Sequence, residues 1–240
     1  MLSMHSARLR AALAAVAVSL LVSACATTTV SPSSASATVT SLRRIARQNL
    51  CVTEGEVRDA GGGQMEVDSP AMRAVVAGSE PEVAELHFVY RGPTSQTSAL
   101  ANGEVRRQVA LKLRAEDSCN VVYVVWRFEP ESKVVVQTKR NPGKHSHREC
   151  GDHGYETIPG IVTKQVPSPR AGEEHLLQAT VTGEALQVFL DRELVWQGDL
   201  GTAADFSGPV GIRTDNARLA FEMAALSGNS SDCGGYADNR

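Results

Sequence analysis

The sequence predicts one all-β domain, a sandwich of two antiparallel sheets that follows a signal peptide and a flexible tether. Three observations predict it. From residue 64 onward, apolar residues recur with a period close to two, the spacing of a strand with one buried face. No long stripe of helical period follows the leader, and Gly, Pro and Asp separate the apolar runs. Removing the leader and the tether leaves roughly 185 residues, enough for one core.

Residues 1–24 have the pattern of a bacterial signal peptide. A short basic start contains Arg8 and Arg10 and no acidic residue, and an apolar run over residues 11–21 follows it. This run is shorter than the about 20 residues that a membrane-spanning helix needs, and small residues follow it, as at a cleavage site. The sequence therefore predicts export. After the leader, no run of 18 apolar residues occurs.

The leader ends in Val22-Ser23-Ala24-Cys25, which resembles the lipobox of bacterial lipoproteins. The resemblance implies that Cys25 carries a diacylglyceryl group and becomes the first residue of a mature protein held at a membrane by its acyl chains. Ala26, rather than Asp, follows the cysteine, which by the same resemblance implies the outer membrane of a Gram-negative cell envelope. An ordinary secretory signal that is cleaved near Ala24 is the alternative.

Residues 25–44 are expected to form the tether. Residues 26–40 are mostly Ser, Thr and Ala, with no charged or aromatic side chain that could build a core. The basic segment Leu42–Arg47 is interpreted as a solvated lead-in, with one helical turn as the alternative. The sandwich domain is expected over residues 45–228, and a C-terminal tail over residues 229–240.

The charge of the chain argues against a nucleic-acid partner. The formal net charge is −3, and without Arg8 and Arg10 of the leader 22 Lys and Arg remain against 27 Asp and Glu, a charge of −5. A general nucleic-acid binder needs an excess of cations to neutralise phosphates. The sequence also contains no glycine-rich phosphate loop and no nucleophile elbow. We therefore expect no nucleotide chemistry.

Four cysteines follow Cys25, and they are expected to form two disulfides. They are Cys51, Cys119, Cys150 and Cys233, an even number in a chain bound for an oxidising compartment. The sequence alone allows three pairings. We favour Cys119–Cys150, which would tie loops around a hairpin, and Cys51–Cys233, which would join the two ends of the domain. Each would stabilise the fold by about 2–4 kcal/mol.

A metal site is the competing interpretation of one cysteine. Three of the six histidines, His145, His147 and His153, lie within nine residues and close to Cys150. In an extended segment, His145 and His147 would lie on one face. Their spacing matches no standard structural zinc pattern. We therefore expect a basic, glycine-rich surface loop held by a disulfide, with no metal.

Two segments have the alternation of strands with one buried face. In Val83–Arg91 the apolar face consists of Ala84, Leu86, Phe88 and Tyr90. In Glu104–Arg114 the residues expected to face inward are Val105, Val109, Leu111 and Leu113, and those expected to face outward are Arg106, Gln108, Lys112 and Arg114. One face of each strand is therefore expected in the core, and the other is expected to be polar.

Asn120–Phe128 and Lys133–Arg140 are expected to form a hairpin, because Glu129-Pro130-Glu131-Ser132 between them is a turn of suitable length. Further strands are predicted at His175–Thr182, Leu186–Leu190, Leu194–Gly198, Val210–Arg213 and Arg218–Leu226. Eight or more short strands indicate a sandwich.

The stretch from His175 to Phe221 contains HLLQATVTGEALQVFLDRELVWQGDL and GPVGIRTDNARLAF. These segments resemble the closing strands of the concanavalin A-like lectin and glucanase superfamily, which includes laminin G-like domains. The resemblance implies a jelly-roll sandwich, whose concave face often binds glycans, and it suggests calcium by analogy only. Asp191-Arg192 stands where Asp-Gly would be typical, so Arg192 either adopts a positive φ or the turn differs.

Candidate ligand-binding side chains are polar groups that can hold sugar hydroxyls or an anionic substituent, and rings that can stack on a sugar. They are Arg107, Gln108, Lys112, Arg127, Lys139, Asn141, His145, His147 and Tyr155. If the basic members converge in one groove, an anionic polysaccharide suits it better than a neutral one. A solvated convex face is the alternative. Trp196 is interpreted as a packing residue, and Tyr123 and Trp126 must face opposite sides of their strand.

The sequence favours binding without catalysis. Sandwich glucanases use Glu-x-Asp-x-Glu on one strand, but here Glu66-Val67-Asp68 is followed by Pro70 instead of a third carboxylate. Arg, Gln, His and Tyr, the residue types of the sandwich alginate lyases, occur among the candidates without the lyase motifs. We therefore expect a lipid-anchored envelope protein that binds a glycan or another envelope component. A polysaccharide-degrading enzyme and a structural envelope protein are the alternatives.

Overall fold

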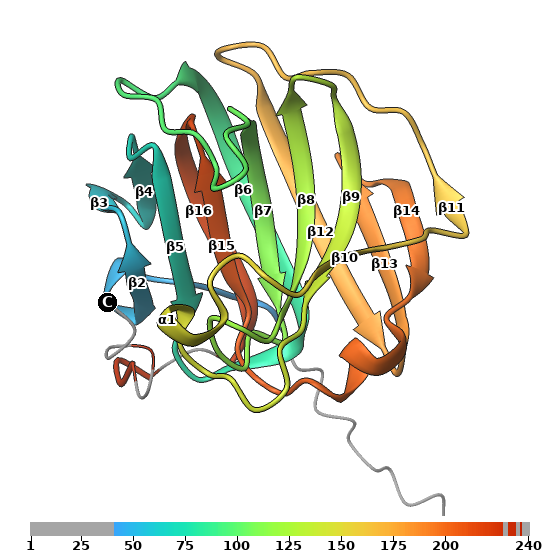
Figure 1. The fold of residues 1–240 in the computed structure, drawn as a ribbon. Helices are drawn as coiled ribbons and strands as arrows, with labels where there is room; N and C mark the ends of the chain where they lie inside the picture. Colours follow the sequence, from blue (N-terminus) through green and yellow to red (C-terminus); the bar gives the residue numbers. More distant parts are fainter. Residues whose placement is uncertain (1–40, 228–229, 234–235, 237–240) are drawn as a thin grey trace, which may run out of the picture. The chain divides into compact units, whose positions relative to one another are not determined.

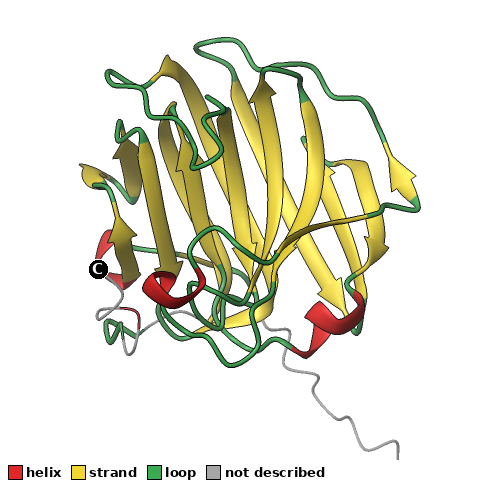
Figure 2. Ribbon diagram, viewed as in Figure 1, coloured by secondary structure: helices red, strands yellow, loops and turns green. Residues whose placement is uncertain are grey.

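The computed structural model describes residues 41–227, 230–233 and 236, which form a β-sandwich of two layers (Figure 1). Strands make up both layers, and Figure 2 shows helices only as short segments outside the sheets. The predicted signal peptide, the lipid-modified Cys25 and the tether up to residue 40 lie outside the described residues. No helix in the described part of the chain has the length and apolar character that crossing a bilayer requires.

One layer is an antiparallel sheet of seven strands. In spatial order they are β10 (Tyr155–Ile158), β9 (Lys133–Lys139), β8 (Val121–Glu129), β7 (Arg107–Leu113), β15 (Gly211–Asp215), β5 (Ala71–Val76) and β2 (Leu50–Glu54). The predicted hairpin across residues 129–132 is confirmed as β8 and β9, with Val124 opposite Val136.

The second layer is an antiparallel sheet of nine strands. In spatial order they are β11 (Val162–Thr163), β14 (Glu193–Asp199), β13 (Ala185–Leu190), β12 (Glu174–Thr182), β6 (Ser79–Pro93), β16 (Ala217–Ser227), β4 (Gln64–Val67) and β3 (Arg58–Gly61), with β1 (Arg43–Arg44) also paired to β16. Successive strands often alternate between the two sheets. β6 of the nine-stranded sheet comes between β5 and β7 of the seven-stranded sheet, and β15 of the seven-stranded sheet comes between β14 and β16 of the nine-stranded sheet. The predicted all-β jelly-roll sandwich of two antiparallel sheets is confirmed.

The short helical segments are η1 (Arg47–Asn49), α1 (His147–Cys150) and η2 (Gly201–Asp205). The basic lead-in therefore takes part in the fold, because β1 lies within it, η1 begins at its last residue, Arg47, and Ile45 between them is 1% exposed. The described fold begins at Arg43, two residues before the expected start of the domain.

The core lies between the sheets, because alternate side chains of the central strands point into the space between them. The apolar face predicted for β6 is confirmed, since all four of its residues are buried. Trp126 lies in the same core, while Tyr123 belongs to a second cluster on the other side of its sheet. Trp196 is also buried in the core, as expected of a packing residue.

The strand predicted at residue 104 begins at Arg107, and the prediction that Val105 faces inward was wrong. Val105 is 52% exposed, because residues 94–106 leave the sheet. Asn216 in the tight turn between β15 and β16 holds this segment: its side-chain amide donates to the carbonyls of Ser98 and Arg106 at 2.8 Å each.

The turn between β13 and β14 keeps the backbone of a tight hairpin without a glycine. Asp191 and Arg192 have φ of 52° and 69°, the positive values that a two-residue hairpin turn favours. The Asp191 carboxylate accepts a hydrogen bond from the Leu176 backbone amide at 2.8 Å. Its other oxygen lies 2.9 Å from Nδ1 of His175. These contacts offset the conformational cost of the left-handed residues.

Both favoured disulfides are present. Cys51 in β2 is bonded to Cys233, and Cys119 is bonded to Cys150 at the end of α1. The first pair joins residues 182 apart in sequence and the second pair residues 31 apart.

Candidate ligand-binding face

The candidate site is the outer face of the seven-stranded sheet, the side turned away from the core. The alternation that buries Leu111 and Trp126 in the core directs their neighbours to this side. The polar and aromatic residues of this side include Arg73 (β5), Arg213 and Asp215 (β15), Gln108 and Lys112 (β7), Tyr123 and Arg127 (β8), Lys133, Gln137 and Lys139 (β9) and Tyr155 (β10).

The sheet curls toward this side. Nη1 of Arg213 in β15 donates a hydrogen bond to the hydroxyl of Tyr155 in β10 at 3.3 Å, although β9, β8 and β7 lie between these strands. In a flat sheet, four strand spacings would separate β10 from β15 by roughly 19 Å, which is more than the two side chains together can span. We therefore call this side the concave face.

A buried ion cluster crosses β5, β15 and β7. The Asp215 carboxylate accepts hydrogen bonds from Nη2 of Arg73 at 2.6 Å, Nε of Arg213 at 2.8 Å and Nε2 of Gln108 at 2.7 Å. Burial alone would raise the pKa of Asp215, but Arg213 and Arg73 hold it at about 2. Burial alone would lower the pKa of Arg213, but Asp215 outweighs it and the pKa is raised. One carboxylate therefore faces two guanidinium groups.

Two tyrosines stack beside this cluster. The ring centroids of Tyr123 and Tyr155 are 6.1 Å apart, with 26° between the ring planes. The Arg213 guanidinium lies 5.2 Å from the Tyr123 ring centroid, and the Lys139 ammonium lies 5.3 Å from that of Tyr155, within the range of cation–π attraction. Tyr123 is buried, whereas Tyr155 is 39% exposed. Tyr155 therefore presents an aromatic surface to solvent next to cations.

Lys112 lies in β7 with Gly211 opposite it in β15 and Tyr123 opposite it in β8. Lys112 faces away from the core, as expected, but it is only 5% exposed, which the alternative of a solvated face does not explain. Burial, reinforced by the cations Arg73 and Arg213, lowers the pKa of Lys112 to about 7. No hydrogen bond or ion pair among the described residues involves its ammonium group. Gln108, also expected to face away from the core, does so and is likewise buried.

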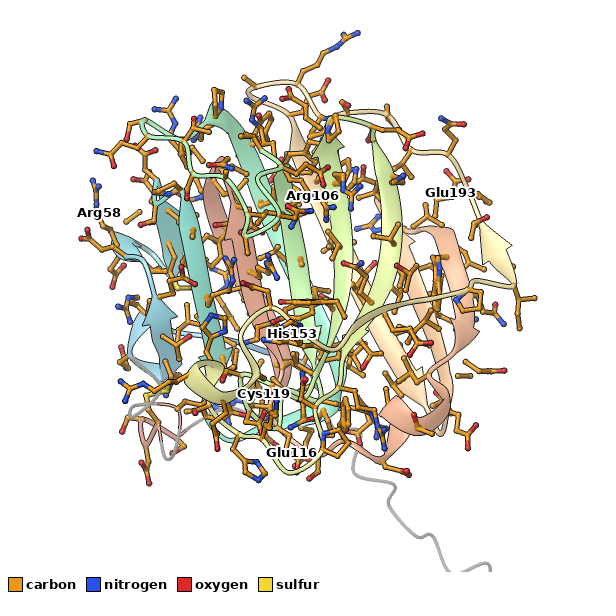
Figure 3. The ribbon with its side chains drawn as sticks, viewed as in Figure 1. Arg58, Arg106, Glu116, Cys119, His153 and Glu193 are labelled. Carbon is orange, nitrogen blue, oxygen red and sulfur yellow. A yellow bond between two sulfur atoms is a disulfide. The ribbon has the colours of Figure 1, made fainter. Side chains whose placement is uncertain are left out.

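Two long connections, residues 94–106 and 140–154, border the concave face. Figure 3 shows Arg106 from the first and His153 from the second on the viewer's side of the seven-stranded sheet. The second connection contains α1 and runs across this side in Figure 1. The disulfide Cys119–Cys150 ties α1 to the segment that leads into β8.

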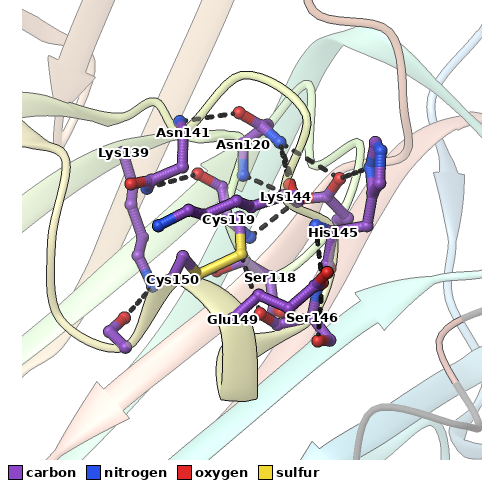
Figure 4. Close-up of a disulfide and its surroundings, with 12 residues drawn as sticks. Ser118, Cys119, Asn120, Lys139, Asn141, Lys144, His145, Ser146, Glu149 and Cys150 are labelled. Carbon is purple, nitrogen blue, oxygen red and sulfur yellow. Dashed lines mark hydrogen bonds and ion pairs between the residues drawn. A yellow bond between two sulfur atoms is a disulfide. The ribbon is translucent and has the colours of Figure 1, made fainter.

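Lys139 and Asn141 hold the 140–154 connection in place (Figure 4). Nζ of Lys139 donates to the carbonyls of Ser118 at 3.1 Å and Gly151 at 2.6 Å. Nδ2 of Asn141 donates to two backbone carbonyls at 3.2 and 2.9 Å. Both candidates therefore use their polar atoms for protein contacts.

The three clustered histidines do not converge on one point. Nδ1 of His145 lies 2.8 Å from Oδ2 of Asp117, and this hydrogen bond raises the pKa of His145. His147 and His153 have exposed side chains, and Cys150 is used in a disulfide. Within the described ranges, no group of three His, Cys, Asp or Glu side chains is placed to hold a metal ion.

Two arginine candidates have different positions. Arg107 forms an ion pair with Glu129 and lies beside Tyr90, because a bulge between Arg107 and the next residue of β7 interrupts the alternation. Arg127 remains on the concave face, half-buried, and its Nε has no partner among the described residues. Burial lowers the pKa of Arg127, and nearby Arg106 lowers it further.

Sequence reasoning missed the three charged members of the buried ion cluster. Arg213 and Asp215 are two residues apart in β15, and this spacing places both on one side of a strand. Arg73 is the one charged residue of the short strand β5. A charged residue inside a short apolar strand was the signal for each of them.

The outer face of the nine-stranded sheet, which we call the exposed face, has a different character. His87 and Glu174 lie 3.0 Å apart with half or more of each side chain exposed. Arg44 and Glu222 form an ion pair at 2.9 Å. Glu66, the first carboxylate of the incomplete glucanase pattern, is exposed in β4 of this sheet. Charges on this face are therefore paired in solvent.

No protein-family model and no curated protein matches the chain. The carbohydrate-binding module CBM66 from Bacillus subtilis is 16% identical over 72% of this chain and 91% of that chain, with a TM-score of 0.48. The galectin LEC-6 of Caenorhabditis elegans is 12% identical over 75% and 99%, with a TM-score of 0.39. The Crh5 transglycosylase in complex with NAG is 14% identical over 80% and 85%, with a TM-score of 0.44.

Proposed function

We propose that this protein is a lipid-anchored cell-envelope protein whose sandwich domain binds an anionic polysaccharide on its concave face, without catalysis. The observation that carries the proposal is the concentration of cations there. Arg73, Arg213, Lys112 and Lys139 lie on one face, and Asp215 is the carboxylate buried among them. The proposal rests on these side chains and not on the named neighbours.

The chemistry of the face suits a sugar that carries negative charge. The half-exposed ring of Tyr155 can stack on the apolar face of a sugar. Oε1 of Gln108 and Nε of Arg127 are buried without a partner among the described residues, and such atoms are costly unless a water or a ligand satisfies them.

The carboxylates support binding rather than glycoside hydrolysis. A glycosidase needs two carboxyl groups facing each other, one of them with a raised pKa. Asp215 is held at a pKa of about 2 between two arginines, so it is not available as a general acid. Glu66 lies on the exposed face, and Oδ1 of Asp68 accepts a hydrogen bond from the Ser95 amide at 2.8 Å.

Binding is tested by affinity electrophoresis of the full chain through gels containing alginate, dextran sulfate or neutral dextran. We expect retardation by an anionic polymer and none by dextran. Tyr155→Ala should weaken binding about fivefold to tenfold, the effect of losing a stacking contact of roughly 1 kcal/mol. His87→Ala on the exposed face is the matched control and should change nothing. Absence of retardation across a panel of envelope polysaccharides would refute the proposal.

The anchor is tested separately, because it depends on the leader. Metabolic labelling with a palmitate analogue should label the wild-type chain in its host, and Cys25→Ser should abolish the label. Calcium, which only the resemblance implies, is tested by repeating the electrophoresis with a chelator. An unlabelled wild-type chain would contradict the lipid anchor and leave the binding result untouched.

A further inference from the structure

Lys112 differs from Arg73, Arg213 and Lys139 because its charge has no partner, and it differs from the half-buried Arg127 because it is almost fully buried. Arg73 and Arg213 share the Asp215 carboxylate, and Lys139 donates to two backbone carbonyls. The Lys112 ammonium, in contrast, has no hydrogen bond or ion pair with the described residues, although the residue is 95% buried. A buried cation without a partner destabilises the fold. Such a residue is a candidate for a role in binding.

The ammonium of Lys112 is still reached by solvent. Oε1 of Gln108 and Nε of Arg127 are fully buried and have no partner among the described residues. Nζ of Lys112 also has no partner, but it is not one of the fully buried atoms. Its neighbours in the sheet leave no open space beside it, because the backbone of Ala74 and Val75 in β5 fills the side-chain position of Gly211 and the other neighbour is the buried ring of Tyr123. A small anionic group can therefore reach the ammonium only from the solvent side of the sheet.

The electrostatic surroundings of Lys112 favour an incoming anion. The charged and titratable groups that face it from the elements around it are Glu54 of β2, Arg73 of β5, Arg213 and Asp215 of β15, Tyr123 of β8, Lys139 of β9 and Tyr155 of β10. Cations outnumber carboxylates in this set. The resulting positive potential attracts an anion to the same place where it repels a proton.

We infer that Lys112 is the anion contact of the concave face and takes one carboxylate or sulfate substituent of a sugar residue. This inference rests on the proposed function and names the group that the site recognises. Binding couples to protonation: a neutral Lys112 amine takes up one proton as it pairs with one anionic group, so the net charge of the pair is zero. Because the pKa of Lys112 in the folded protein without ligand is about 7, the affinity for the anionic group should be highest below pH 7. Above pH 7 it should fall by up to tenfold per pH unit.

The test compares the full chain with Lys112→Met and with the matched control Lys164→Met. Lys164 lies at the edge of the other, nine-stranded sheet, where it is exposed and paired with Glu193. At pH 6, Lys112→Met should bind alginate (carboxylate) or dextran sulfate (sulfate) at least tenfold more weakly than wild type, and the polymer that responds identifies the substituent. Its binding should not change between pH 6 and pH 8.5. Its melting temperature should be equal to or higher than that of wild type, because a buried unpaired charge is removed, so weaker binding cannot be ascribed to unfolding.

Small anions separate this inference from the proposed function. Sodium sulfate and sodium acetate are compared with sodium chloride at equal ionic strength, and the melting temperatures of wild type and Lys112→Met are measured. An increase in wild type that is smaller in Lys112→Met supports an anion site at Lys112, even if no polysaccharide binds. Equal increases in the two proteins, or unchanged polymer binding by Lys112→Met, overturn the inference. Retained pH-dependent binding by that variant would overturn it while leaving the proposed function standing.

Discussion

The two outer faces of the sandwich follow the same strand alternation and differ in what covers them. On the exposed face, His87 and Glu174 are paired with at least half of each side chain in solvent. On the concave face, Lys112 and Arg213 are at most 9% exposed. Solvated pairs contribute little to stability, whereas buried charges are costly unless they are paired. The fold therefore tolerates the electrostatic cost of buried charges on the concave face and avoids that cost on the exposed face.

The largest expected effect comes from removing the carboxylate of the concave face. Asp215→Asn leaves the Arg73 and Arg213 guanidinium groups buried without their shared anion. We expect a loss of about 3 to 5 kcal/mol in the free energy of unfolding, measured by urea denaturation. The matched control Glu222→Gln breaks the solvated pair with Arg44 and should cost less than about 1 kcal/mol. Equal losses in the two variants would erase the distinction between the faces.

A slightly smaller effect is expected from the disulfide that supports the border of the concave face. The Cys119–Cys150 bond closes a loop across 31 residues, so replacing both cysteines with serine should cost about 3 to 4 kcal/mol by chain entropy. Hydrogen exchange should speed up in residues 140–154 and stay unchanged in β12 and β13, which lie in the other sheet. Faster exchange in both sheets alike would show that the two faces are not independent.

The smallest of the three effects is a pH dependence of stability. The pKa of Lys112 is about 7 in the fold and about 10.4 for an unfolded lysine. Between these values the unfolded state binds more protons, so the free energy of unfolding contributed by this residue rises with pH. We expect a rise of about 2 kcal/mol between pH 7 and pH 9, taken as the difference between wild type and Lys112→Met. A difference that does not change with pH would mean that Lys112 titrates at its ordinary value.

The alternation of the strands was predictable because it depends on neighbouring residues only. The opposite orientations of Tyr123 and Trp126 follow from their odd spacing in one strand. Burial of the outer side was not predictable in this way. Lys112 faces away from the core as the alternation of its strand predicts, but the groups that surround it come from distant strands. Alternation tells which side a residue faces and not what lies on that side.

The candidate site was partly predictable for the same reason. Gln108, Lys112, Arg127 and Tyr155 lie together on the concave face as the converging-groove interpretation requires. Arg107 is separated from them by a bulge that no periodicity indicates. The favoured disulfide pairings are confirmed, because they join segments that the topology had to bring together.

The positions of the aromatic residues have a spectroscopic consequence. Both tryptophans, Trp126 and Trp196, are buried in the core between the sheets, whereas Tyr123 and Tyr155 form the stacked pair on the concave face. Unfolding should therefore shift the tryptophan emission to longer wavelength, while a ligand on the concave face should leave that emission nearly unchanged and perturb tyrosine absorbance. The chain thus contains separate optical reporters for folding and for binding.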